Sequence, residues 1–346
     1  MASLVTALVL SAVSAAQDAD CKAPGTCVAP AGALHSVVAP MSPRKQWGDS
    51  GGYCGSLSVQ AIALSHGVWI SQDQVRKAAG PGGGHGDKTN GYEILHTNIG
   101  GALDALKLDH NDWDFNQPEP QYKGYLLWLK QQLARGWGVV WMILCKGDGH
   151  DTYGIAKYDH VEPVFGIYSN DSLSGNITSY NDDDVIRHGS DYSPDGEGNT
   201  GYFRRMDSLM DTVLMDGNCK DARPGVGNNE PYPCVPFGKD YGFAITGQSG
   251  YTGPSLSLSV DSFEEPDIKR GAKPAELHGV VSVSGLAKGA AHTLYRFADA
   301  ASIPASTSDY EKAALFSHKF AAQEGSYVYH DPMTIVSSGT AYYRVV

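Results

Sequence analysis

The sequence predicts an α+β protein in which a helical half precedes an antiparallel β half, followed by a C-terminal β-sandwich. Three observations carry this fold class. Apolar residues recur at helical spacing up to about residue 136, and continuous apolar runs typical of buried strands begin at residue 139. Alternation of apolar and polar residues, with turn residues between the runs, begins near residue 254. A chain of 346 residues is long enough for one large or two medium domains.

The helical half is organised around the stretch from Gln46 to Ser58, QWGDSGGYCGSLS. Cys54 follows a glycine-rich turn and begins a predicted helix that Gly67 is suited to end. The apolar residues of this helix share one face: Leu57, Ala61 and Leu64. Because a helix N-terminus favours an anion and the thiolate is the nucleophilic form of cysteine, Cys54 is a candidate nucleophile. The alternative is a small buried structural cysteine.

Three further helices and three strands are expected after this one. The pattern Ser71-Gln-Asp-Gln74 is typical of a capping box and predicts a helix through about Ala79. Apolar residues on one face predict a third helix and a fourth that stops at Gly136, and these residues are Leu95, Ile99, Leu103, Leu106, Leu126, Leu129 and Leu133. Strands are predicted over 139–144, 161–168 and 177–180, with a turn at 169–175.

The N-terminal residues indicate secretion. Residues 3–16 have the composition of a signal-peptide apolar region, with Val13 and Ala15 at the small-residue cleavage positions. This region is too short to span a membrane. We therefore expect the protein outside the cell or in the lumen of the secretory pathway, a vacuole or lysosome included. Asn170 and Asn176 each begin a glycosylation sequon, which makes both of them glycosylation candidates.

The six cysteines fit an oxidising compartment. Four of them flank two turn-rich loops and are disulfide candidates, Cys21 with Cys27 and Cys219 with Cys234. Because four cysteines allow three connectivities, this pairing stays open. Cys145 ends an apolar run and is interpreted as a core thiol. Under this pairing Cys54 has no disulfide partner.

The net charge of −12 argues against nucleic acid or an anionic membrane as a partner. Residues 182–184 and 191–199 are rich in aspartate, but their spacing matches no calcium-binding loop. No metal and no cofactor is therefore expected.

The order of these features resembles the papain-like cysteine peptidases, and most closely the C39-like peptidases that process bacteriocin leaders. The order is a Gln, then Cys-Gly at a helix start, then a His at a strand start, then an Asn/Asp cluster. LKQQLARG at 129–136 and DHVEPVFG at 159–166 resemble the segments around the catalytic histidine of that family. The similarity covers roughly 46–185. The sequence departs from the pattern at Ser56, where proline is common, and Gln46 lies eight residues before Cys54, slightly further than usual.

Acyl transfer to a thiol needs a thiolate, a base that later protonates the leaving amine, and donors aimed at the developing oxyanion. Cys54 supplies the thiolate, and His160 fits the base because a strand can hold its ring across from the helix terminus. His150, in a loop, is the rival base. The Gln46 amide and the Cys54 backbone N–H are the expected oxyanion donors.

The residue that orients His160 is expected to be Asn181. A strand that turns at 169–175 and runs back through 177–180 would bring Asn181 beside His160. Asp182 is the alternative if the register slips by one residue.

The sequence thus predicts a secreted cysteine peptidase that acts on peptides or proteins. Its expected parts are a signal peptide over 1–16, an extended segment over 17–45, a papain-like domain over 46–250 and a fibronectin- or immunoglobulin-like β-sandwich over 254–346. The sandwich is expected to fold independently, with a glycan or surface component as its partner. The alternatives are an inactive wall- or surface-binding protein and an acyl-transfer relative, such as an amidase, a peptide ligase or a transglutaminase-like enzyme.

Overall fold

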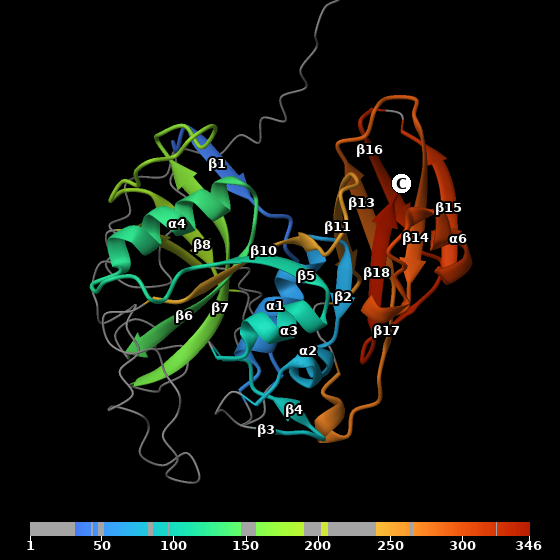
Figure 1. Ribbon diagram of the computed structural model, residues 1–346, viewed down its shortest axis with the longest axis horizontal. Helices are drawn as coiled ribbons and strands as arrows, with labels where there is room; N and C mark the ends of the chain where they lie inside the picture. The colour runs from blue at the N-terminus through green and yellow to red at the C-terminus, as the bar shows by residue number, and fades with distance from the viewer. Residues whose placement is uncertain are drawn as a thin grey trace, which may run out of the picture.

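The computed structural model describes residues 32–42, 44–47, 52–81, 86–95, 97–146, 157–189, 202–206, 240–262, 266–322 and 324–346. Within these ranges, side chains are described except those of 142–146, 157–160, 202, 204 and 269. Helices pack against antiparallel sheets (Figure 1), so the predicted α+β class is confirmed.

In the described part of the chain, seven strands form one antiparallel sheet. Its main path runs β5 (Leu108–Asp112), β10 (Gly242–Gln248), β6 (Val139–Lys146), β7 (Lys157–Ser169), β8 (Val185–His188) and β9 (Tyr202–Arg205). The seventh strand, β1 (His35–Val38), pairs with the last residues of β7. The apolar runs at 139–144 and 161–168 are therefore strands, as predicted, and both strands are longer than expected.

Each face of this sheet is covered by a helix. On one face, α1 (Cys54–Leu64) packs in a cluster with Val140, Val161 and Ile245. On the other face, α4 (Tyr122–Ala134) packs in a cluster with Val139, Trp141 and Val164. This division follows from the alternation of side chains along each strand.

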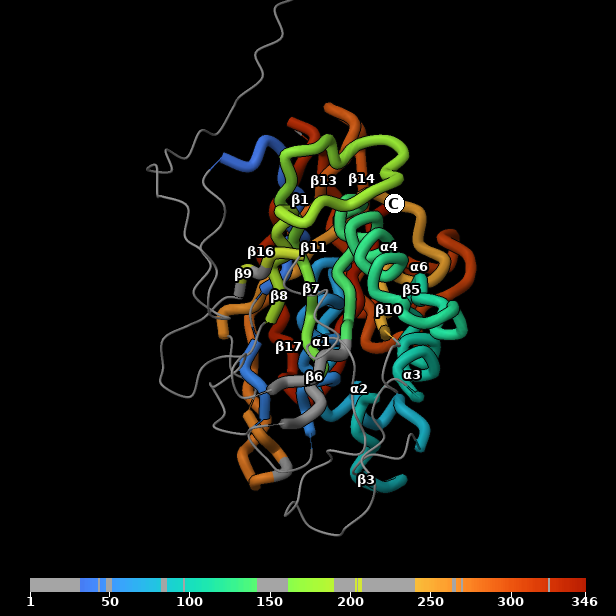
Figure 2. Tube along the Cα trace, turned by 90° about the vertical axis from the view of Figure 1, so that its left-hand side faces the viewer, coloured from blue at the N-terminus to red at the C-terminus, as the bar shows by residue number. Residues whose placement is uncertain are grey.

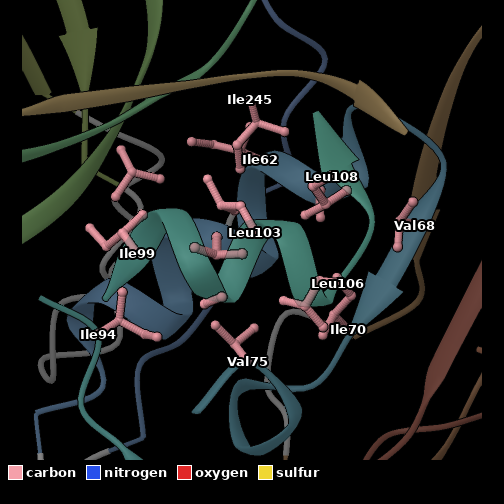
Figure 3. Packing of buried hydrophobic residues seen from close by; sticks show 14 of the residues in the cluster. Ile62, Val68, Ile70, Val75, Ile94, Ile99, Leu103, Leu106, Leu108 and Ile245 are labelled. Atoms are coloured by element: carbon pink, nitrogen blue, oxygen red, sulfur yellow. The ribbon is translucent and has the colours of Figure 1, made fainter. Parts of the chain in front are cut away.

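The helix α1 begins at Cys54, as the sequence predicts, but every one of its residues is buried. A one-sided apolar pattern was expected, whereas the helix is surrounded by β7, β6 and β10 on one side. On its other sides it contacts α2 (Gln72–Ala78), β2 (Val68–Ile70) and β11 (Ser255–Val260). Its polar residues are therefore bonded internally; Gln60 Nε2, for example, donates to the Ile70 carbonyl at 2.9 Å. Figure 3 shows Ile62 of α1 packed with Leu103 and Ile245 in this core.

The other predicted helices are present. Ser71 caps α2 (Gln72–Ala78), and its hydroxyl accepts a hydrogen bond from the Gln74 N–H at 3.2 Å. The third helix, α3 (Ile99–Ala105), is shorter than the pattern from 95 to 106 indicates. The fourth, α4, ends before Gly136, whose φ of +79° is easily adopted by glycine. A small hairpin, β3 (Gly86–Asp87) with β4 (Gly91–Tyr92), lies between α2 and α3.

The described residues of the C-terminal part form two larger sheets and a strand pair. One sheet contains β11 (Ser255–Val260), β13 (Gly279–Ser284) and β16 (Ser326–His330). The other contains β15 (Phe316–Ala321), β14 (Ala291–Phe297), β18 (Thr340–Val345) and β2 (Val68–Ile70). The pair is β12 (Glu276–Leu277) with β17 (Ile335–Val336), and α6 (Tyr310–Ala313) precedes β15. Residues of both larger sheets share one hydrophobic cluster, for example Leu258, Val281 and Leu294.

The strand β2 joins the N-terminal and C-terminal parts. This strand follows α1 in the chain, directly after Gly67. It pairs antiparallel with β18, with Trp69 opposite Ala341. Figure 1 shows the C-terminal sheets beside the helices, with β2 adjoining β18, and in Figure 2 these sheets lie behind the N-terminal part. Leu64 and Trp69 lie in the same cluster as the C-terminal core residues. One C-terminal sheet is thus completed by a strand that follows the Cys54 helix, so this sheet is shared by residues on both sides of the expected domain boundary.

The strand predicted over 177–180 is absent, because these described residues form no strand. The chain returns to β7 only at β8, where Val185 pairs with Tyr168 and His188 with Val164. Residues 170–184 instead form a connection outside the sheet. No helix in the described ranges is long and apolar enough to cross a membrane.

His66 makes the stability of this fold sensitive to acid. Its Nε2–H donates to the Ile245 carbonyl at 3.1 Å, and burial lowers the pKa of His66 from 6.5 to about 4. Below pH 6.5 the unfolded chain binds a proton that the folded chain does not bind until about pH 4, so stability falls as the pH drops through this window. We expect a loss on the order of 2 kcal/mol, after allowance for the partial exposure of the residue.

Urea unfolding of wild type and His66→Gln at pH 7.5, 5.5 and 4.5 checks this prediction, and the variant should lose less stability in acid. His110→Gln is the control of opposite sign. A hydrogen bond to Asp112 raises the pKa of His110, so its contribution is present below pH 6.5 and is lost as the pH rises through the raised value. An identical acid dependence in wild type and His66→Gln would contradict the assignment.

Candidate active site around Cys54

Cys54 is the first residue of α1, and its thiol is free. The preceding cap residue, Tyr53, makes no side-chain hydrogen bond to the helix, and the first turn contains no acidic residue. The first N–H groups of the helix are therefore not bonded by a capping side chain and can face an anion. Cys54 is 5% exposed, so only a small part of its surface faces solvent.

Two glycines allow close packing around this helix start. A Cβ built on Gly55 would meet the Ile94 carbonyl oxygen at 2.6 Å. Gly52 has a φ of +65°, and a Cβ there would meet Glu93 Oε1 at 1.6 Å. The segment at 93–94 thus lies directly against the turn and the first residues of α1. Gly55 is required by this backbone contact, which gives a packing reason for the Cys-Gly pair.

Ser58 ties the start of α1 to β7. Its hydroxyl lies 2.8 Å from the Cys54 carbonyl oxygen and 3.3 Å from the Val161 carbonyl oxygen, close enough to donate to either. One buried side chain therefore connects the nucleophile candidate to the residue that follows His160. Hydrogen bonding of Ser58 to a carbonyl four residues earlier is common within helices, whereas its contact with β7 is specific to this fold.

His160 lies within β7, and its backbone pairs with Ile143 of β6. Its side chain is outside the described part of the structure. The next two residues face opposite sides of the sheet. Val161 packs in the cluster that contains Cys54, and Glu162 bonds to His188 on the α4 side.

Gln46, the predicted oxyanion donor, precedes Trp47 in an irregular segment beside α2. Gln46 is partly buried, and its Oε1 atom accepts no hydrogen bond from any described residue. The neighbouring backbone groups of Lys45 and Trp47 are bonded to Gln72.

The structure does not bring Asn181 to His160. Asn181 lies before β8, where its N–H donates to Asp184 Oδ2 at 2.8 Å and its side chain donates to Asp171 at 2.7 Å. These partners are near Ser169, at the opposite end of β7 from His160. His160 and Ser169 are nine residues apart, about 30 Å along the strand. The return strand on which the Asn181 prediction depended is absent, and Asp182 lies exposed in the same connection.

The residue that holds this connection is Asp184, which the sequence pattern did not single out. Asp184 and Lys130 form a buried ion pair with an N–O distance of 2.7 Å, and Lys130 Nζ also lies 3.3 Å from Ser169 Oγ. The sequence contained a signal for this pair, because Lys130 lies on the same helix face as the apolar residues Leu126 and Leu133 of α4. A buried lysine requires an acidic partner, and the Asp182–Asp184 cluster supplied three candidates.

A second buried pair was also not predicted. His188 Nδ1 and Glu162 Oε2 lie 2.6 Å apart, and the His188 ring packs on Trp141 with ring centroids 5.4 Å apart. This pair joins β7 and β8 on the α4 side of the sheet. Its position relative to the α1 core makes it a structural pair rather than a part of the Cys54 site.

Of the remaining predicted residues, two lie on the surface and the others lie outside the described residues. Asn170 and Asn176 are exposed, as glycosylation requires, and Asn170 donates to Asp183 at 3.2 Å. Cys21, Cys27, Cys219, Cys234 and His150 lie outside the described residues, as does the segment 1–16. Among the described residues, no group of three or more His, Cys, Asp or Glu side chains is placed to hold a metal ion.

Comparison of the chain with protein-family models, with curated proteins and with solved structures finds no match.

Proposed function

We propose that the chain is a cysteine peptidase with a papain-like catalytic region, in which Cys54 is the nucleophile and His160 is the base. One observation carries the proposal: Cys54 begins a buried helix, and Ser58 links that helix start to the Val161 carbonyl of β7, the residue that follows His160 in the sequence. The resemblance to papain-like peptidases implies the same order, with the cysteine at a helix N-terminus and the histidine on an antiparallel strand.

The chemistry assigns one role to each group. The imidazole of His160 takes the proton from Cys54 Sγ, and the sulfur forms a bond to the carbonyl carbon of the scissile peptide. The carbonyl electron pair moves to oxygen, where the N–H groups of the first turn and the Gln46 amide stabilise the negative charge. The imidazolium then gives its proton to the leaving nitrogen as the C–N bond breaks, and water hydrolyses the thioester. The role of orienting His160 is left unassigned, because Asn181 lies at the other end of β7.

The proposed enzyme is secreted, and its C-terminal part supports the catalytic region. The composition of residues 3–16 supports a secreted enzyme with glycans on Asn170 and Asn176. The C-terminal sheets are proposed to form a β-sandwich that supports α1 through β2. The proposed partner of this sandwich is a glycan or a surface component.

The second candidate function is a non-catalytic surface- or wall-binding protein. The observation that favours it is the burial of Cys54, since an inert structural cysteine is also buried. The two candidates differ in turnover. Hydrolysis of fluorescent casein by the reduced wild-type protein at pH 6 to 7 supports the peptidase. Complete absence of hydrolysis, of transfer to an added amine and of Cys54 alkylation would support the binding protein.

Substitution of His160 tests the base. We expect His160→Asn to lower casein turnover roughly 10³-fold or more, because the thiol then lacks the group that removes its proton and later protonates the leaving amine. His188→Asn is the matched control, since it makes the same change on the same sheet, in the pair on the α4 side. Turnover should follow His160 after correction for any loss of folded protein. Wild-type activity in His160→Asn would overturn the assignment and direct attention to His150.

A further inference from the structure

One side chain binds the backbone on both sides of Gln46. Gln72, the buried first residue of α2, donates from Nε2 to the Lys45 carbonyl at 2.8 Å. Its Oε1 accepts a hydrogen bond from the Trp47 N–H at 3.2 Å. Only a carboxamide offers a donor and an acceptor in this fixed arrangement, so neither glutamate nor a methionine of similar length can make both bonds.

The same segment is anchored one residue earlier. Arg44 is buried, its guanidinium donates to Gln60 Oε1 of α1 at 3.4 Å, and it lies over the Trp69 ring at 4.7 Å. It also donates to the Ser262 carbonyl. Residues 44–47 belong to no helix or strand, so these side chains supply hydrogen bonds that regular secondary structure would otherwise provide.

The next turn of α2 contacts the residues that directly precede Cys54. Arg76, four residues after Gln72 and therefore on the same helix face, donates from Nη1 to the Gly52 carbonyl at 2.8 Å. Its guanidinium lies over the ring of Tyr53 at 4.5 Å. One face of α2 thus binds both the backbone around Gln46 and the turn that immediately precedes Cys54.

We propose that Gln72 is a positioning residue that fixes Gln46 relative to Cys54 and thereby sets the geometry of the oxyanion site. This inference rests on the proposed function, which assigns the Gln46 amide as an oxyanion donor. A donor stabilises the developing charge only when it is held in place before the reaction, and small displacements of such groups lower rates strongly. Gln72 touches neither thiol nor substrate; it acts through the backbone of residues 45 and 47.

Two probes separate positioning of the oxyanion site from reactivity of the thiol. A panel of dipeptide aldehydes forms hemithioacetals with an active-site thiol, and these place an oxygen where the oxyanion forms. Iodoacetamide alkylates the thiol without forming an oxyanion. We expect Gln72→Glu to weaken binding of the best aldehyde roughly 10-fold or more, with an alkylation rate of Cys54 within about 2-fold of wild type.

Gln74→Glu is the matched control, because it is the same change on the same helix at a side chain that bonds to Ser338 instead. It should leave aldehyde binding unchanged. The double variant Gln46→Ala/Gln72→Glu should bind aldehyde no more weakly than Gln46→Ala alone, since Gln72 is proposed to act through Gln46. Gln72→Met serves as the second variant if Gln72→Glu does not fold.

Equal effects at positions 72 and 74, additive losses in the double variant, or parallel losses in both probes would overturn the positioning role. These outcomes would leave the proposed function standing, provided that wild type binds an aldehyde and its Cys54 is alkylated. A wild-type protein that does neither overturns both proposals.

Discussion

Replacement of Cys54 by alanine is expected to abolish casein turnover and to remove the site of iodoacetamide labelling at pH 6.5, while the protein stays folded. In the proposed mechanism the Cys54 sulfur is the protein atom that forms a covalent bond to the substrate. Its loss should therefore lower turnover roughly 10⁴-fold or more. The fold should tolerate the change, because alanine fits the apolar cluster that contains Cys54 and leaves only a small void. We expect a stability loss of about 1 kcal/mol, measured by urea unfolding.

Peptide mapping by mass spectrometry identifies the labelled residue. Free glutathione, an ordinary thiol, provides the reference rate at the same pH, and Cys54 should react faster because the proposed mechanism requires a reactive nucleophile. Cys145→Ala is the matched control and should keep both labelling and turnover. Labelling that persists in Cys54→Ala, or that maps to Cys145, would show that the wrong cysteine was assigned.

The helix that carries Cys54 was predictable because several local signals agree. Glycine precedes it, the apolar residues have helical spacing, and Gly67 adopts a φ of +72° after its end. The two long strands β6 and β7 were predictable for a similar reason, since continuous apolar runs of this length are buried on both faces of a sheet. These signals depend on neighbours in sequence and needed no tertiary information.

The connection from 170 to 184 was mispredicted because its structure depends on a distant residue. Ile177 and Tyr180 gave an apolar pattern that favours a strand, yet in the described part of the chain they pair with no strand. The buried ion pair of Asp184 with Lys130 holds this connection to α4 and moves the return strand to 185–188. The geometry at Asn181 follows from that pair, because its N–H is bonded to the same carboxylate. Such a pairing over 54 residues cannot be obtained from local periodicity.

The strand β2 was missed for a different reason. Its three residues, Val68, Trp69 and Ile70, lie between two helices and are too few to show alternation. They form a strand only because β18, which is more than 250 residues later in the chain, offers an unpaired edge. The boundary expected near residue 254 did not take this strand into account, since a boundary read from changing periodicity does not detect a strand contributed from elsewhere.

Because β2 pairs with β18, the N-terminal part is expected to depend on the C-terminal sheets for its stability. We expect a protein that ends at residue 250 to lose its cooperative fold, and with it the reactivity of Cys54. Truncation removes β18 and leaves Trp69 and Leu64, both fully buried, without their C-terminal partners. It also removes Tyr342, whose hydroxyl donates to the Leu106 carbonyl at 2.8 Å after α3. Each large buried apolar side chain contributes about 1.5–3 kcal/mol, so exposure of several approaches the 5–15 kcal/mol that stabilises a typical domain.

Urea unfolding followed by tryptophan fluorescence, together with the iodoacetamide rate at Cys54, measures this effect. Point variants of the full chain test the same contact without truncation. Trp69→Ala should cost about 3–5 kcal/mol, because it empties a fully buried site between β2 and the C-terminal core. Val328→Ala is the control: this residue of β16 is exposed, so the change should cost less than about 0.5 kcal/mol. A truncated protein that unfolds cooperatively near the wild-type midpoint and keeps a reactive Cys54 would contradict the argument, because the N-terminal part would then be stable without the sheet that β2 completes.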